Sequence, residues 1–138
     1  MQYTLHLSIS DLNYLHKHAE NNLPSEAAAL LFGQVSDTLV VVRHIELVQN
    51  EATSNITSFT VNPEEQYQLL VEAEERGQDL VGIFHSHPAP PYPSSRDQQN
   101  MKLNPVVWLI ASKDSGKWVS KAFLMEDDQV QEVNLQLT

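Results

Sequence analysis

The pattern of apolar and polar positions changes its period several times along the chain. Residues 10–23 carry leucines and an alanine three to four positions apart, which predicts an amphipathic helix. Ser10 is expected to cap this helix and Pro24 to stop it. A shorter helix is predicted over residues 94–103.

Residues 62–77 form the clearest predicted helix. Asn62 stands at the N-cap, Pro63 and acidic residues occupy the first turn, and Gly77 ends the helix. Its buried apolar stripe is expected to consist of three side chains: Tyr67, Leu70 and Val71.

Strands are predicted where side chains alternate, or where a short apolar run is bounded by turn residues. The segments are residues 3–9, 26–35, 39–47, 58–61, 79–87, 105–112, 117–125 and 130–137. A Ser-Asp turn joins the second and third of these into a hairpin, and the fifth is apolar enough to be buried on both faces. The order β-α-β-β-β-α-β-α-β-β-β predicts an α/β fold in which helices sandwich a mixed sheet.

The composition fits a single domain over residues 1–138 and limits its chemistry. No cysteine is present, so disulfides and Cys-ligated zinc sites are excluded. The 8 Lys and Arg against 18 Asp and Glu give a net charge of −10, which disfavours binding to nucleic acid. The first residues lack the basic and apolar regions of a signal peptide, and the apolar runs are too short to cross a membrane. We therefore expect a soluble, cytoplasmic protein.

The candidate chemistry lies in the stretch FHSHPAPPYPSSRD, residues 84–97. His85 and His87 alternate at the end of a predicted strand, so their imidazoles share one face. Asp97 in the next element could complete three ligands and leave the fourth position of a tetrahedral metal open, as in catalytic zinc sites. Two other interpretations remain open: a polar strand end, and a helix capping box formed by Ser94 and Asp97.

Two further residues could support a metal site. Glu26 opens an apolar strand and could accept a proton, although its position alone favours a solvated strand terminus. Ser94 could donate a hydrogen bond to an oxyanion or merely cap the helix, and its neighbour Ser95 could share the capping role. Ser86 is expected to face away from the two histidines and to be structural.

The remaining histidines and the tryptophans suggest no second site. His6, His16, His18 and His44 are predicted to be surface residues. Trp108 and Trp118 lie on predicted strands and are expected in the core or in an interface.

Together these residues resemble the JAMM/MPN+ metalloproteases of the Mov34 superfamily, also called the JAB or MPN domain. The similarity covers most of the chain, through the segments PSEAAALLFG, VNPEEQYQLL and LVGIFHSHPAPPYPSSRD. The family signature is Glu, then His-x-His-Pro, then Ser-x-x-Asp. It is met by Glu26, His85, His87, Pro88, Ser94 and Asp97.

The resemblance implies an MPN fold, described as cytidine-deaminase-like, and a zinc-dependent isopeptidase. His85, His87 and Asp97 would bind Zn²⁺, and a zinc-bound water would be the nucleophile. Glu26 would serve as the general base and Ser94 would stabilise the oxyanion. The implied substrates are amide bonds after the Gly-Gly tail of ubiquitin, ubiquitin-like or sulfur-carrier proteins and their conjugates.

The chain departs from the family pattern in small ways. Ala28 and Ala29 replace a usual Cys-Gly pair, and the spacer between Pro88 and Ser94 is about one residue short. No large insertion is present, as in minimal prokaryotic members. The segment Asn50 to Phe59 is our candidate for a strand edge that pairs with the substrate tail.

Two rival functions follow from the same residues. A catalytically inactive MPN scaffold would bind partners without metal, although such relatives lose signature residues that this chain keeps. An iron oxygenase could also use two histidines and one carboxylate, but that class favours β-rich barrels with few helices.

Overall fold

The computed structural model describes residues 2–49, 62–87 and 90–138. Its elements are β1 (Thr4–Leu7), α1 (Ile9–Asn22), β2 (Ala28–Ser36), β3 (Leu39–Val48), α2 (Pro63–Glu75), β4 (Asp79–Ser86), α3 (Ser95–Leu103), β5 (Val107–Asp114), β6 (Lys117–Glu126) and β7 (Gln129–Leu137). Each corresponds to an element predicted from the sequence. The strand predicted over residues 58–61 lies outside the described residues.

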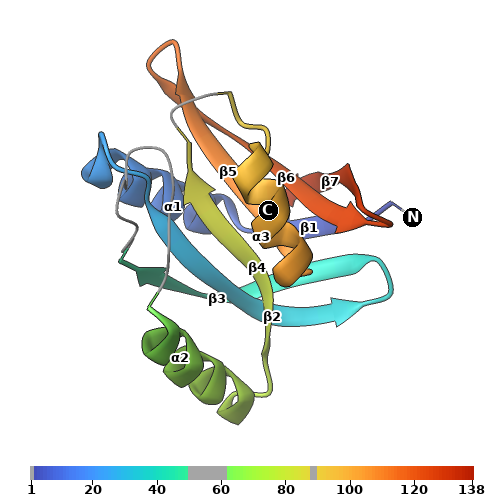
Figure 1. Cartoon of the computed structure of the whole chain (residues 1–138). Helices are drawn as coiled ribbons and strands as arrows, with labels where there is room; N and C mark the ends of the chain where they lie inside the picture. Colours follow the sequence, from blue (N-terminus) through green and yellow to red (C-terminus); the bar gives the residue numbers. More distant parts are fainter. Residues whose placement is uncertain (1, 50–61, 88–89) are drawn as a thin grey trace.

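The strands of the described residues form one mixed sheet that closes into a barrel in the order β1-β3-β2-β4-β5-β6-β7 (Figure 1). β1 pairs in parallel with β3 on one side and with β7 on the other, and so joins the two ends of the sheet. β4 and β5 are also parallel, while the remaining neighbours are antiparallel. The β2–β3 hairpin and the mixed sheet were both predicted correctly.

Helices lie on both sides of the central strands, with α1 behind the sheet and α3 in front of it in Figure 1. Leu15 and Ala19 of α1 belong to one hydrophobic cluster, whereas Ala73 of α2 and Met101 of α3 belong to another. β2, β4 and β5 supply side chains to both clusters, which is why they are almost continuously apolar. The predicted arrangement, with helices on both sides of a mixed sheet, is therefore confirmed for the central strands. The closure of the sheet by β1 was not foreseen, and the cytidine-deaminase-like description is not confirmed.

The start of α1 differs from the prediction. Ser8, not Ser10, is the N-cap, and its Oγ accepts a hydrogen bond from the Asp11 backbone N–H at 3.0 Å. The chain leaves β1 at Leu7, so the helix begins as soon as the strand ends, and Ser10 falls within the first turn. None of the described helices is both long and apolar enough to cross a lipid bilayer.

The buried stripe predicted for α2 is wrong for Tyr67 and Leu70, while Val71 is half-buried and the Asn62 cap is confirmed. Tyr67 is 69% exposed and Leu70 is 36% exposed. Ala73 is buried instead, and Leu69, one turn earlier, packs against the same cluster. The helix is apolar on more than one side, so its sequence period alone did not decide which side faces the sheet.

The register of β2 places the residues that precede it beside the end of β4. Ala28 pairs with His85, and β2 is irregular farther along, where its register shifts at Phe32 and Gly33. Only glycine fits at position 33, because a Cβ there would lie 1.8 Å from the carbonyl oxygen of Val41. The irregularity re-aims the far half of β2 while its first half stays in register with β4.

Candidate active site

Few polar side chains are buried in the part of the chain that the structure describes. They are Glu26, His85, Ser86, Asp97 and Ser112, each at most 5% exposed. The first four come from the segment before β2, from β4 and from α3, and they lie together at the end of β4. Burying ionisable groups is costly unless they are paired or used, so this cluster is the strongest candidate for a functional site.

The two histidines arrive together because β4 is extended. His85 is fully buried with its ring 5.9 Å from that of Trp108, and its ring lies 5.7 Å from that of His87. His87 follows the last residue of the strand, and its backbone N–H donates to the Ala111 carbonyl on β5 at 2.8 Å. Both imidazoles therefore face the side of the sheet that α3 covers, as the alternation predicted.

Asp97 reaches the histidines from the first turn of α3. It completes a capping box: the Ser94 backbone N–H donates to Asp97 Oδ2 at 2.9 Å, and the Asp97 N–H donates to Ser94 Oγ at 3.1 Å. The capping interpretation of this pair is thus confirmed, and it is compatible with the metal interpretation. The cap fixes the rotamer that points the carboxylate toward β4.

The carboxylate of Asp97 spans both imidazoles. Its Oδ1 lies 3.2 Å from His85 Nε2 and its Oδ2 lies 3.5 Å from His87 Nε2. Ligand bonds of 2.0–2.2 Å to a tetrahedral zinc ion would separate neighbouring ligand atoms by about 3.3–3.6 Å. These two separations are close to that range, and two imidazoles with one carboxylate are suitable zinc ligands.

The side chains of His85, His87 and Asp97 match a zinc site in the type of their donor atoms and in the spacing of those atoms, but they are not arranged around an ion. No group of three or more His, Asp or Glu side chains within the described ranges is arranged to hold an ion as it stands. The Asp97 carboxylate instead contacts the two imidazoles directly, one oxygen to each. An ion held by His85, His87 and Asp97 would replace these direct contacts.

Glu26 joins the cluster from the segment before β2. Its side chain is 3% exposed, and its Oε1 lies 3.2 Å from His85 Nδ1. A solvated strand terminus is therefore the wrong interpretation of this residue. His85 Nδ1 also lies 3.1 Å from the Ser86 carbonyl, so the ring is oriented from the side opposite Asp97.

The electrostatics of the cluster favour a positive charge between the two carboxylates. Burial by itself lowers the pKa of His85, but the bonds to Asp97 and Glu26 outweigh burial and raise it to about 9. Burial raises the pKa of Asp97, but His85 and the Ser94 N–H more than offset this, and the net shift is downward. The imidazolium of His85 thus has the electrostatic environment that a metal cation would also find favourable.

Ser94 lies at the edge of this cluster. Its oxygen accepts the Asp97 N–H, and a hydroxyl keeps one hydrogen to donate. The structure therefore brings Glu26, His85, His87 and Asp97 into direct contact and attaches Ser94 to them through Asp97. The oxyanion role of Ser94 stays a prediction.

Residues 10–124 match the family described as prokaryotic homologs of the JAB domain. The chain belongs to this family. The prokaryotic JAB domain is 38% identical over 112 residues to a desampylase of Pyrococcus furiosus, which covers 80% of this chain and 74% of the relative. It is 32% identical over 106 residues to a desampylase of Haloferax volcanii, which covers 76% of this chain and 75% of the relative.

Solved structures share the fold. Protein DSY2949 from Desulfitobacterium hafniense superposes on the JAB domain with a TM-score of 0.84 and 31% identity, covering 97% of this chain and 92% of that one. A protein from Salinibacter ruber superposes with a TM-score of 0.71 over 99% of this chain and 92% of that one. At 22% identity the second likeness concerns the fold alone.

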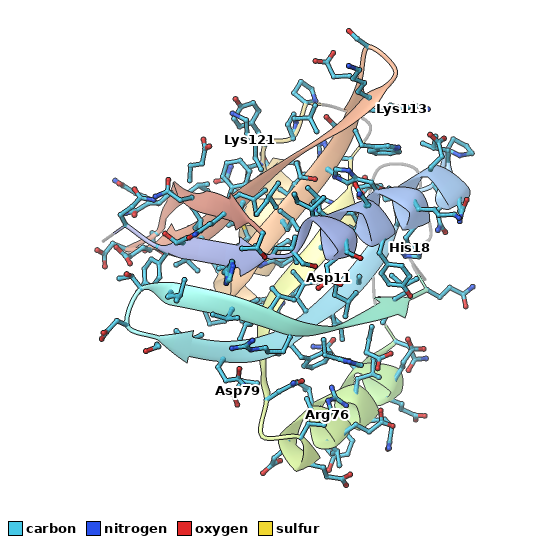
Figure 2. The ribbon with its side chains drawn as sticks, turned by 180° about the vertical axis from the view of Figure 1, so that it is seen from behind. Asp11, His18, Arg76, Asp79, Lys113 and Lys121 are labelled. Carbon is cyan, nitrogen blue, oxygen red and sulfur yellow. The ribbon has the colours of Figure 1, made fainter. Side chains whose placement is uncertain are left out.

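One contact of the JAB domain near the site was not foreseen from its sequence. His18 of α1, labelled in Figure 2, is half-buried, and its Nε2 lies 2.9 Å from the carbonyl oxygen of Ala28 at the start of β2. A carbonyl only accepts, so Nε2 carries the hydrogen, and the Asn22 side chain donates to Nδ1 at 3.3 Å. Burial lowers the pKa of His18, which favours this neutral form.

The prediction that His16 and His18 are surface residues is wrong. Like His18, His16 is half-buried, and its Nε2 lies 2.6 Å from Ser120 Oγ on β6. His44 contacts Glu46 at 2.6 Å, and Trp108 is buried in the core as expected. The candidate tail-binding segment Asn50 to Phe59, together with Pro88, lies outside the described residues.

Proposed function

We propose that this prokaryotic JAB domain is a zinc-dependent isopeptidase or peptidase. It would hydrolyse the amide bond after the C-terminal Gly-Gly tail of a ubiquitin-like or sulfur-carrier protein. The observation that carries the proposal is the convergence of buried Glu26, His85 and Asp97 with His87. It is supported by the two relatives named desampylases, a name that denotes removal of a conjugated ubiquitin-like modifier.

The roles of the side chains follow from their chemistry. His85, His87 and Asp97 would hold the zinc ion, and their separations suit its ligand shell. When bound, the ion would supply a Lewis acid and lower the pKa of a coordinated water to about 7. Glu26, buried beside His85, would take a proton from the attacking water and pass it to the leaving amine. The Ser94 hydroxyl would donate a hydrogen bond to the oxyanion.

The function is tested with several ubiquitin-like proteins that end in Gly-Gly, each fused to a short peptide or joined to a lysine side chain. Incubation with the protein, followed by mass analysis, is expected to show a cut directly after the second glycine. A chelator is expected to stop the reaction and added zinc to restore it. A protein that binds no stoichiometric zinc and cuts none of these substrates would be a scaffold instead, while activity restored only by iron would point to another enzyme class.

Ser94→Ala is expected to lower turnover about 10- to 1000-fold, the range for loss of one oxyanion donor. Zinc content should stay at one ion per chain, because the serine is not one of the proposed ligands. Turnover and metal content are measured on the same preparation. Ser95→Ala, one residue into α3, is the matched control and should retain its rate. An unchanged rate for Ser94→Ala would leave this serine as a helix cap only.

A further inference from the structure

Two hydrogen bonds join Ser86, the last residue of β4, to Ala27, the residue just before β2. Its hydroxyl oxygen accepts the Ala27 backbone N–H at 2.8 Å, and its own N–H donates to the Ala27 carbonyl at 3.0 Å. The serine is 3% exposed and lies between His85 and His87. Its side chain points to the opposite face of β4, toward the chain segment that carries Glu26.

The position of these bonds matters because regular pairing ends just before Glu26. The last register pair of β2 with β4 joins Ala28 to His85, so Glu26 lies two residues beyond the ladder. The Ala27 N–H belongs to the same planar peptide unit as the carbonyl and Cα of Glu26. A bond that holds this N–H therefore holds the Cα of Glu26 in place and restricts where its side chain can reach.

From this geometry we propose that Ser86 is a positioning residue for Glu26. The inference rests on the proposed hydrolytic function, in which Glu26 transfers protons. Without the hydroxyl, the buried Ala27 N–H would lose its acceptor, and the segment would gain by moving toward water. Such a movement would carry the Glu26 carboxylate away from its place 3.2 Å from His85 Nδ1.

The first test compares Ser86→Ala with Ser86→Thr, which keeps a hydroxyl on the same carbon. Ser86→Ala is expected to lower kcat about 10- to 100-fold, because a misplacement of about 1 Å costs that much. KM should stay within about twofold, and zinc content should remain at one ion per chain. Ser86→Thr should recover most of the rate. Ser120→Ala is the matched control, since it removes a serine hydroxyl that contacts His16 at 2.6 Å outside the site.

A double-mutant cycle separates positioning from general loss of structure. In a Glu26→Gln background, Ser86→Ala should cause no further loss of rate, because the residue through which it acts is already disabled. An unchanged kcat for Ser86→Ala, or an equal loss in both backgrounds, would overturn the proposal.

Amide hydrogen exchange provides a readout that does not need activity. In Ser86→Ala, the Ala27 amide should exchange at least about tenfold faster while core amides of β5 keep their protection. Unchanged exchange at Ala27 would also overturn the proposal. If the wild-type protein cleaves no substrate, the proposed function fails, but the exchange measurement still decides whether Ser86 anchors the Glu26 segment.

Discussion

Glu26→Gln is expected to retain zinc and the fold but to lower the rate of hydrolysis about 10²- to 10⁴-fold, the contribution typical of a general acid–base group. Glutamine has nearly the same size and keeps an oxygen that can face His85 Nδ1. It cannot accept a proton near neutral pH. Because Glu26 is only 3% exposed, we expect that no carboxylate on the protein surface can reach the same position and replace it as a proton acceptor.

The measurement combines kcat on a cleavable ubiquitin-like fusion with zinc content per chain. Glu46→Gln is the matched control, because Glu46 also contacts an imidazole, that of His44, at 2.6 Å, but in a partly exposed pair on β3. Its rate should stay within about twofold of wild type, as for a surface ion pair. A Glu26→Gln rate near wild type would show that another group moves the proton. Loss of zinc from Glu26→Gln would make this residue a ligand instead.

The local parts of the site were predictable from short stretches of sequence. Alternation along a strand places His85 and His87 on one face, and the three-residue spacing of Ser94 and Asp97 defines a capping box. Each rule concerns neighbours within a few positions, so the tertiary fold could not alter it. The helices and strands themselves were also predicted, apart from their exact ends.

The contact of Glu26 with His85 could not be predicted from spacing, because the two residues are far apart in the chain. It depends on the register of β2 against β4, and the Ala27–Ser86 bond that extends this register joins residues 59 positions apart. The local sequence shows only an acidic residue before an apolar run, and the role of Glu26 beside the histidines was predicted from the family signature. Barrel closure likewise requires β1 to pair with β7 from the other end of the chain.

The errors on the helices have a common cause. The spacing of apolar residues in a helix predicts that one side is apolar, but it does not predict which elements pack against the other sides. His16 and His18 are polar, yet α1 lies against the sheet, so both reach partners on β6 and β2. Tyr67 and Leu70 are apolar, yet α2 turns Ala73 toward the core and leaves them exposed.

Asp97→Ala is expected to abolish stoichiometric zinc binding, and with it activity, because two imidazoles alone leave the ion short of a ligand. The substitution also removes the capping box of α3, which should lower the free energy of unfolding by roughly 1 kcal/mol. Asp97→Asn separates the two effects. Its amide oxygen can still accept the Ser94 N–H, so the cap is largely kept, while the negative charge that favours a cation is lost.

The control is Asp11→Ala, on α1, which lies in front of the sheet in the view of Figure 2. Asp11 stands in the first turn, three residues after the N-cap Ser8, as Asp97 stands three residues after Ser94. The α1 bond uses the Asp11 backbone N–H, which alanine keeps, whereas the Asp97 side chain itself accepts the Ser94 N–H. Asp11→Ala should therefore cost less stability than Asp97→Ala and leave zinc at one ion per chain, since none of the proposed ligands lies in the first turn of α1. Zinc is measured by elemental analysis after dialysis, and stability by denaturant unfolding. Full zinc occupancy in both Asp97 variants would mean that another side chain supplies the third ligand. Asp97 would then not be a zinc ligand, and the ligand set proposed here would be wrong.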